Sequence, residues 1–140
     1  GSGRSVIVKF RKNKVVEIIK KDHFFSRIHV EDIATAIILS IRNKTPGEIF
    51  NVCDDMPSPS DEVVRFAAGL MNIKKIESKN FDDNVLNQRT KDFYLDNKRV
   101  KNKKIKKILG WTPKFENYKL GLEEILNIIN GKNTANNPLS

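Results

Sequence analysis

The sequence predicts an α/β fold, because segments with strand character alternate along the chain with segments of helical periodicity. The clearest helix covers residues 31–41. A run with little charge at residues 49–52 suits a buried parallel strand, and a second helix is expected to begin at Ser58. A strand followed by a helix, after an earlier strand and helix, is typical of this fold class.

The composition indicates one domain with a basic surface. The 140 residues fit a single domain, and an apolar share of 39% supports a hydrophobic core. The formal net charge of +9 suits an anionic ligand, nucleic acid or simple solubility equally well. The single cysteine, Cys53, excludes an internal disulfide and a cysteine-only metal site. No apolar run reaches membrane-spanning length and no secretion signal is present, so we expect a cytoplasmic protein.

The helix at residues 31–41 is expected to lie deepest in the fold. Its apolar residues recur at the spacing of one buried helical face: Ile33, Ala34, Ile37, Ile38 and Ile41. Glu31 and Asp32 stand in its first turn, where carboxylates complement the positive end of the helix dipole. Before this helix, residues 15–19 read as a short strand. Residues 5–10 are rich in β-branched side chains and also read locally as a strand.

The next helix has a recognisable beginning. Ser58 is the expected N-cap, Pro59 the first helical residue, and Asp61 lies three positions after the cap. Beyond this helix, residues 73–76 suit a short strand. The polar stretch at residues 81–90 is expected to be a loop or an irregular helix.

Two further helices are delimited by capping residues. Asn102 is expected to cap a helix that stops at Gly110. Asn117 is expected to cap the last helix, which Gly131 ends. The domain therefore covers residues 1–131, and the polar residues 132–140 form a mobile tail.

Three segments, in this order, resemble the extended short-chain dehydrogenases/reductases, the NAD-dependent epimerase/dehydratase family. Residues 27–34 (Arg-Ile-His-Val-Glu-Asp-Ile-Ala) are similar to its hVxDxA segment. Residues 47–54 are similar to its GxxYNVxD strand, with Phe50 in place of the usual Tyr. Residues 104–113, which end in Leu-Gly-Trp-Thr-Pro, are similar to its SKAxxxLGWxP segment. Residues 97–100 (Asn-Lys-Arg-Val) are similar to a stretch of the nucleoside-diphosphate-sugar epimerase-like subgroup.

The resemblance implies that this chain is the C-terminal, substrate-binding half of such a protein, with a partial Rossmann-type unit. It implies a helix rather than a strand at residues 5–10, and we favour the helix. It also implies that the central helix and residues 49–52 join a nucleotide-binding sheet. The substrate, plausibly a nucleotide-sugar, would face four residues: Arg4, Arg27, His29 and Arg99. Arg4 is included because residues 1–4 stand where the family often has a Gly-Pro-Gly-Arg turn.

The parts that catalysis would need are not in their expected places. Binding NAD(P) in this family requires a glycine-rich turn between a strand and a helix, and none of the seven glycines forms one. Tyr94 and Lys98 have the spacing of the family's Tyr-x-x-x-Lys pair. They follow the hVxDxA segment, whereas the family's pair precedes it, so we interpret them as a chance match with Tyr94 packed and Lys98 solvated. The chain alone is not expected to be catalytic, and NAD(P) belongs to the missing half.

Several candidate site residues have two interpretations. Arg27 either binds a substrate phosphate or carboxylate or forms an ion pair with Glu31 or Asp32. His29 is expected to be a packed, hydrogen-bonded side chain at the start of the helix, and no metal-ligand spacing accompanies it. Beside Cys53, Asp54 and Asp55 would raise the thiol pKa, which indicates a buried structural cysteine. The two aspartates are either paired acids or loop caps, and we favour the loop caps.

Seven cations fall within ten residues: Lys98, Arg99, Lys101, Lys103, Lys104, Lys106 and Lys107. They form either the solvated face of an amphipathic helix, a contact for the phosphates of a sugar nucleotide, or a nucleic-acid surface. We expect partners to be a second copy, by exchange of elements in a homodimer, or a separate cofactor-binding half. The alternative functions are a small basic nucleic-acid-binding module and a non-catalytic interaction domain.

Overall fold

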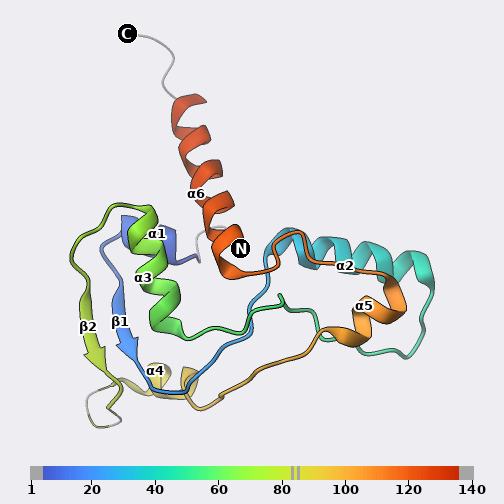
Figure 1. The fold of residues 1–140 in the computed structure, drawn as a ribbon, viewed down its shortest axis with the longest axis horizontal. Helices are drawn as coiled ribbons and strands as arrows, with labels where there is room; N and C mark the ends of the chain where they lie inside the picture. The colour runs from blue at the N-terminus through green and yellow to red at the C-terminus, as the bar shows by residue number, and fades with distance from the viewer. Residues whose placement is uncertain (1–4, 83, 85, 136–140) are drawn as a thin grey trace.

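A computed structural model describes residues 5–82, 84 and 86–135 (Figure 1). Helices and strands follow one another in the order α1 (Val6–Arg11), β1 (Val16–Ile19), α2 (Val30–Asn43), α3 (Ser60–Leu70), β2 (Glu77–Asn80), α4 (Gln88–Phe93), α5 (Lys103–Leu109) and α6 (Tyr118–Ala135). The strands and α3 lie at one end of the molecule, and α2 and α5 lie at the other (Figure 1). This arrangement confirms the α/β class.

The sheet consists of β1 and β2, which run parallel with Val16 opposite Glu77 and Ile19 opposite Asn80. The strand expected at residues 73–76 is therefore displaced. Ile73 continues from the end of α3, where its N–H donates to the oxygen of Ala68 at 2.9 Å. Ile73 and Ile76 pack against the core, and the strand itself is the exposed polar segment that follows.

One hydrophobic core joins α1, α3 and α6. Its buried members are Ile7, Phe10, Val63, Val64, Ala67, Ala68, Tyr118 and Leu122. The helix favoured for residues 5–10 is confirmed as α1, because Ser5 accepts the Val8 N–H at 3.3 Å and caps it. The helical turn then places Ile7 and Phe10 in the core despite their strand-forming neighbours.

A second, smaller core joins α2 to α5. It contains Ala36, Ile105, Leu109 and Trp111. The helix expected after Asn102 is confirmed as α5, and Gly110 ends it in the left-handed conformation at φ 62°. Asn102 occupies the N-cap position without a capping hydrogen bond, because its side chain bonds elsewhere.

The expectation that the helix at residues 31–41 lies deepest is wrong. α2 buries Asp32 and Ala36, whereas the apolar residues that predicted its buried face are exposed, Ile41 to 71%. Of the described elements, α5 makes the main contact with α2. Periodicity identifies the apolar face of a helix but does not show that another part of the chain covers that face.

The strand expected at residues 49–52 is also not formed. The segment is not paired with another strand, and no backbone group of these four residues bonds to another described residue. Ile49 is 81% exposed. A strand requires a neighbouring strand, and β1 and β2 lie at the other end of the molecule (Figure 1). The parallel strand expected to lead into the Ser58 helix is thus absent from the described chain.

The helix boundaries require two corrections and confirm one cap. Ser58 is not the N-cap of α3; Pro59 is, and the Ser58 hydroxyl donates to the Met56 oxygen at 2.8 Å. The last helix, α6, continues past Gly131 to Ala135. Asn117 caps it as expected, because its Oδ1 accepts the N–H of Lys119 at 3.0 Å. Residues 136–140 of the expected tail lie outside the described residues.

Residues 81–90 were expected to be a loop or an irregular helix. The helix is partly correct, because α4 begins at Gln88 and is capped by Asn87. Across the described ranges, no helix is both long enough and apolar enough to cross a bilayer.

Candidate functional site

A cavity of about 820 Å³ lies between α1, β1, α3, α4 and α6. Its lysine, arginine, histidine and aspartate lining residues are Lys9, Lys14, Arg27, His29, Asp54 and Arg89. Its apolar and aromatic lining includes Val63, Val64, Phe93, Tyr94, Tyr118 and Leu122. The fold thereby brings Arg27 and His29, two of the four residues expected to face a substrate, to the same cavity.

Arg27 is held from one end of its guanidinium group. Its Nη1 donates to the Ser58 oxygen at 2.7 Å and to the Phe25 oxygen at 3.1 Å. Burial lowers the pKa of Arg27, and the nearby carboxylate of Asp54 opposes this effect. The remaining guanidinium N–H groups have no acceptor among the described residues, so they are free to bind an anionic group in the cavity.

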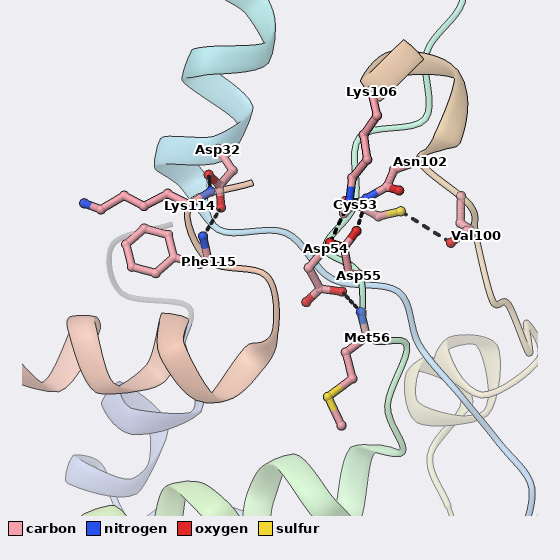
Figure 2. A network of polar contacts seen from close by, with 10 residues as sticks. All are labelled: Asp32, Cys53, Asp54, Asp55, Met56, Val100, Asn102, Lys106, Lys114 and Phe115. Atoms are coloured by element: carbon pink, nitrogen blue, oxygen red, sulfur yellow. Dashed lines mark hydrogen bonds and ion pairs between the residues drawn. The ribbon is translucent and has the colours of Figure 1, made fainter. Parts of the chain in front are cut away.

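The alternative of an ion pair between Arg27 and Glu31 or Asp32 is wrong. Glu31 pairs instead with the ammonium of Lys114 at 3.0 Å. Asp32 is fully buried, and its carboxylate accepts the main-chain N–H groups of Lys114 at 2.7 Å and Phe115 at 3.1 Å (Figure 2). Both acids therefore bind the segment after α5 and not Arg27.

His29 is packed and hydrogen-bonded, as the sequence predicted. Its Nδ1 accepts the Glu31 N–H at 3.4 Å and caps α2, and its ring centre lies 4.0 Å from that of Phe115. Because Nδ1 is an acceptor, the neutral ring carries its hydrogen on Nε2. No described residue accepts that hydrogen, so His29 retains one donor at the cavity.

Asp54 is the site residue that the sequence interpretation missed. Its Oδ1 accepts the Met56 N–H at 3.2 Å, which confirms the expected loop cap (Figure 2). It is also buried at the cavity wall, where burial raises its pKa to about 6 against the opposing effects of the Met56 N–H and Arg27. A carboxyl group that titrates close to neutral pH therefore lies near the Arg27 guanidinium.

Arg99 lies apart from Arg27 and His29. It lines a second cavity of about 520 Å³ beside α5, where its guanidinium carbon lies 3.8 Å from the centre of the Phe24 ring. Asp54 lines both cavities. Arg4, the fourth residue expected to face a substrate, lies outside the described residues.

Three of the seven clustered cations pair with carboxylates. Lys104 binds Glu48 at 2.6 Å, Lys106 binds Asp55 at 2.7 Å and Lys98 binds Asp96 at 2.8 Å. In the described chain the other four have no carboxylate partner: Arg99, Lys101, Lys103 and Lys107. The exposed positions of most of these cations on or next to α5 fit the interpretation of a solvated helix face.

Cys53 and the Tyr94/Lys98 pair occupy positions that fit structural roles. The Cys53 thiol is buried and donates to the Val100 oxygen at 3.4 Å, and burial together with Asp54 and Asp55 raises its pKa (Figure 2). Tyr94 is buried, its hydroxyl donates to the Ile18 oxygen at 3.4 Å, and burial raises its pKa. Lys98 is exposed and bound to Asp96, so the interpretation of this pair as a chance match is supported.

Among the described residues, no three His, Cys, Asp or Glu side chains gather as metal ligands would.

No protein-family model and no curated protein matches this sequence. Among solved structures, a functionally unknown conserved protein from Silicibacter pomeroyi DSS is 40% identical, with a TM-score of 0.84 over 90% of this chain and 45% of its own. RMD from Pseudomonas aeruginosa, in complex with NADPH, is 16% identical, with a TM-score of 0.61 over 86% of this chain and 38% of its own.

A third similar structure is dTDP-glucose 4,6-dehydratase from Bacillus anthracis str. Ames, in complex with NAD. It is 19% identical, with a TM-score of 0.68 over 92% of this chain and 39% of its own. This chain therefore spans less than half the length of each of the three proteins. The likeness confirms the expected fold class, a partial Rossmann-type unit with a parallel strand pair and packed helices.

Proposed function

We propose that this chain is the substrate-binding portion of an NAD(P)-dependent nucleotide-sugar epimerase or dehydratase of the extended short-chain dehydrogenase/reductase family. The three ordered segments at residues 27–34, 47–54 and 104–113 support this proposal. It is also supported by the fold shared with a dTDP-glucose dehydratase in complex with NAD and with a protein in complex with NADPH.

The observation that carries the proposal is the chemistry of the larger cavity. Lys9, Lys14, Arg27 and Arg89 line it together with the single carboxyl group of Asp54, so the lining favours an anion. The same cavity has aromatic and aliphatic walls, which suit the base and the less polar faces of a sugar ring. Its volume of about 820 Å³ lies within the range of small-molecule sites.

Five polar side chains of the cavity have a defined role in this proposal. The free N–H groups of Arg27 bind a phosphate, because the planar guanidinium presents paired donors. His29 donates from Nε2 to a ligand oxygen, and Asp54 accepts from a sugar hydroxyl when it is ionised. Arg89 and Lys14, both exposed at the rim, add charge that attracts the diphosphate.

In this proposal NAD(P) is held by a partner portion, whose glycine-rich turn supplies the dinucleotide site, and hydride transfer takes place only in the combined protein. The 140-residue chain by itself binds the sugar nucleotide without converting it. Arg99 and its cavity are not required for this binding.

The test is a titration of the isotope-labelled chain with dTDP-glucose, followed by amide chemical shifts. We expect saturable shifts around Arg27, Asp54 and Gly121, weaker binding of dTDP and none of glucose. Arg89→Ala should weaken binding, because it removes an exposed rim charge without disturbing the core.

The matched control is Lys107→Ala, which removes an exposed charge outside both cavities and should leave binding unchanged. Absence of saturable shifts, or shifts confined to α5, would contradict the proposal. Salt-dependent retention on a DNA oligonucleotide, lost in Lys107→Ala but kept in Arg89→Ala, would instead favour the nucleic-acid-binding alternative.

A further inference from the structure

The second cavity, beside the start of α5, has a lining with more positive than negative charge. Its cationic lining residues are Arg99, Lys101, Lys103 and Lys106. Two carboxyl groups, Asp54 and Asp55, also line it, so the lining is net positive even when both are ionised. Lys106 binds Asp55 at 2.7 Å, and the pair is neutral (Figure 2). The charge that this pair leaves over comes from three cations without a carboxylate partner in the described chain, Arg99, Lys101 and Lys103.

The main chain places these three unpaired cations on one side of residues 99–103. The Val100 N–H donates to Ser26 Oγ at 2.9 Å, and the Val100 oxygen accepts the Cys53 thiol at 3.4 Å. Asn102 is buried and donates to the Cys53 oxygen at 2.8 Å. Because Val100 and Asn102 face the protein, the three cations that alternate with them are left exposed at the cavity.

Arg99 is oriented by stacking and not by a hydrogen bond. Its guanidinium carbon lies 3.8 Å from the centre of the Phe24 ring. Phe24 is fixed in turn, because its N–H donates to Asn97 Oδ1 at 2.9 Å and its oxygen accepts the Lys98 N–H at 3.2 Å. Stacking uses the face of the guanidinium group, and no described residue accepts the N–H groups at its edge. A planar group held in this way is ready to bind two oxygens of one phosphate.

We propose that the second cavity is a binding site for a compact diphosphate anion, with Arg99 as its principal binding residue. The paired donors of Arg99 bind one phosphate group, and the ammonium groups of Lys101 and Lys103 bind the other. The volume of about 520 Å³ has room for such an anion together with water.

This ligand differs from the sugar nucleotide proposed for the larger cavity. Among the described residues that line the second cavity, the apolar ones are Pro57 and Val100, and none is aromatic. A nucleotide base therefore has no flat apolar wall to stack on. The two cavities share only Asp54. The inference thus goes beyond the proposed function and does not depend on it.

The test is a titration of the isotope-labelled chain with sodium pyrophosphate at constant ionic strength, followed by amide chemical shifts. We expect saturable shifts at residues 99–103. Inorganic phosphate should shift the same amides with binding at least about 10-fold weaker, because it engages fewer of the three cations. At these amides dTDP should bind no more tightly than pyrophosphate. Shifts at Gly121 report the larger cavity and separate the two sites.

Substitutions of the unpaired cations test which groups bind the anion. Arg99→Ala should weaken pyrophosphate binding about 10-fold, because it removes charged hydrogen-bond donors. Arg99→Lys should not restore it, since an ammonium group lacks the paired donors of a guanidinium. Lys103→Ala should weaken binding about threefold. Unchanged shifts of core amides such as Ala67 show that each variant is folded.

Two matched controls remove one positive charge elsewhere. Lys107→Ala changes an exposed position of α5 outside both cavities, and Arg89→Ala changes a residue that lines only the larger cavity. Both should leave pyrophosphate binding at residues 99–103 unchanged, because neither side chain reaches the second cavity.

Four results would overturn the inference. Shifts that grow without saturation would indicate an unspecific effect of salt, and equal weakening by Arg99→Ala and Lys107→Ala would indicate a diffuse basic surface. Tighter binding of dTDP than of pyrophosphate at residues 99–103 would assign the cavity to a nucleotide. A DNA oligonucleotide that binds the same amides more tightly, and less tightly in Lys107→Ala, would assign them to a nucleic acid. None of these results requires dTDP-glucose to bind in the larger cavity, so failure of the inference is distinguishable from failure of the proposed function.

Discussion

The indole Nε1 of Trp111 donates to the main-chain oxygen of Asp32 at 3.2 Å. The Asp32 carboxylate accepts the N–H groups of Lys114 and Phe115, so the start of α2 and the segment after α5 are bonded in both directions (Figure 2). Two of the segments that indicated the family are thus adjacent in space. Their most recognisable residues, Asp32 and Trp111, stabilise the fold and do not line the larger cavity.

We expect Asp32→Ala to destabilise the chain by about 3 kcal/mol, because it leaves two main-chain N–H groups without their acceptor at a buried position. Asp32→Asn keeps one acceptor oxygen and should cost less. The measurement is urea unfolding followed by far-ultraviolet circular dichroism.

The control for Asp32 is Asp96→Ala. Asp96 forms an exposed pair with Lys98 at 2.8 Å, and such pairs contribute at most about 1 kcal/mol. Equal effects of the two substitutions would show that Asp32 does not hold the two segments together.

The sequence predicted elements whose boundaries are set by local chemistry. Ser5, Asn117 and Gly110 each act at the helix end that their residue type favours, because capping depends on neighbours a few positions away. Ser58 is the exception. It is held by an antiparallel bridge to Phe25, and Pro59 takes the N-cap position instead. That long-range contact has no local signal in the sequence.

Burial and pairing were less predictable, because both depend on what lies opposite. The periodicity of the sequence predicted the helix α2 correctly, but it wrongly predicted that the apolar face of this helix is buried. The strand predicted at residues 49–52 was wrong for the same reason, since the composition of this segment suits pairing that the described chain does not supply. β2 was placed too early because its residues (Glu-Ser-Lys-Asn) carry no apolar alternation.

The candidate site was only partly visible in the sequence. Arg27 and His29 were chosen through the family segment that contains them, and the fold brings them together. A loop cap was favoured for Asp54 over a pair of acids with Asp55, although its position directly after a short apolar run was a usable signal of a site residue. Its proximity to Arg27 arises from a tertiary hydrogen bond, in which the Asp54 N–H donates to the Arg27 oxygen at 2.7 Å.

Asn102→Ala should destabilise the chain by about 2 kcal/mol. The Asn102 amide donates to the Cys53 oxygen at 2.8 Å and to Asp55 Oδ1 at 2.7 Å, so its loss leaves a buried carbonyl unpaired. Burial alone would raise the pKa of Asp55, but hydrogen bonds from Lys106 and Asn102 bring it below its ordinary value. Removal of the Asn102 donor should therefore raise this pKa.

Chemical denaturation and carboxyl titration by NMR measure the two effects. Lys106→Ala is the matched comparison, because it removes the other donor to Asp55 at a more exposed position and should cost at most about 1 kcal/mol. An unchanged Asp55 pKa in both variants would refute the assigned cause.

Asp54→Asn should stabilise the chain at pH 7.5. The Asp54 pKa is about 6 in the folded state and lies near its ordinary 3.8 in the unfolded state. Between these values the folded state binds the extra proton, so the Asp54 contribution to stability falls as pH rises. The full difference corresponds to at most about 3 kcal/mol. Asparagine removes it and keeps an acceptor for the Met56 N–H.

The free energy of unfolding, measured from pH 3.5 to 8, distinguishes this effect from a general one. The stabilisation should be largest above pH 7 and should disappear below about pH 4, where Asp54 is protonated in both states. A stabilisation that is independent of pH would show that ionisation of Asp54 is not its cause. If Asp54 also binds the ligand, the same variant should bind dTDP-glucose more weakly.

Cys53 should react slowly with a thiol reagent in the folded protein. The thiol is buried against the Val100 oxygen, and burial with the charges of Asp54 and Asp55 raises its pKa, so little thiolate is present or accessible at pH 8. We expect labelling by DTNB to be at least about 100-fold slower in buffer than in 6 M urea, because reaction requires the thiol to be exposed by opening.

Asn102→Ala should accelerate labelling, because it weakens the contact that holds the Cys53 carbonyl. Equal rates with and without urea would contradict a structural role for this cysteine.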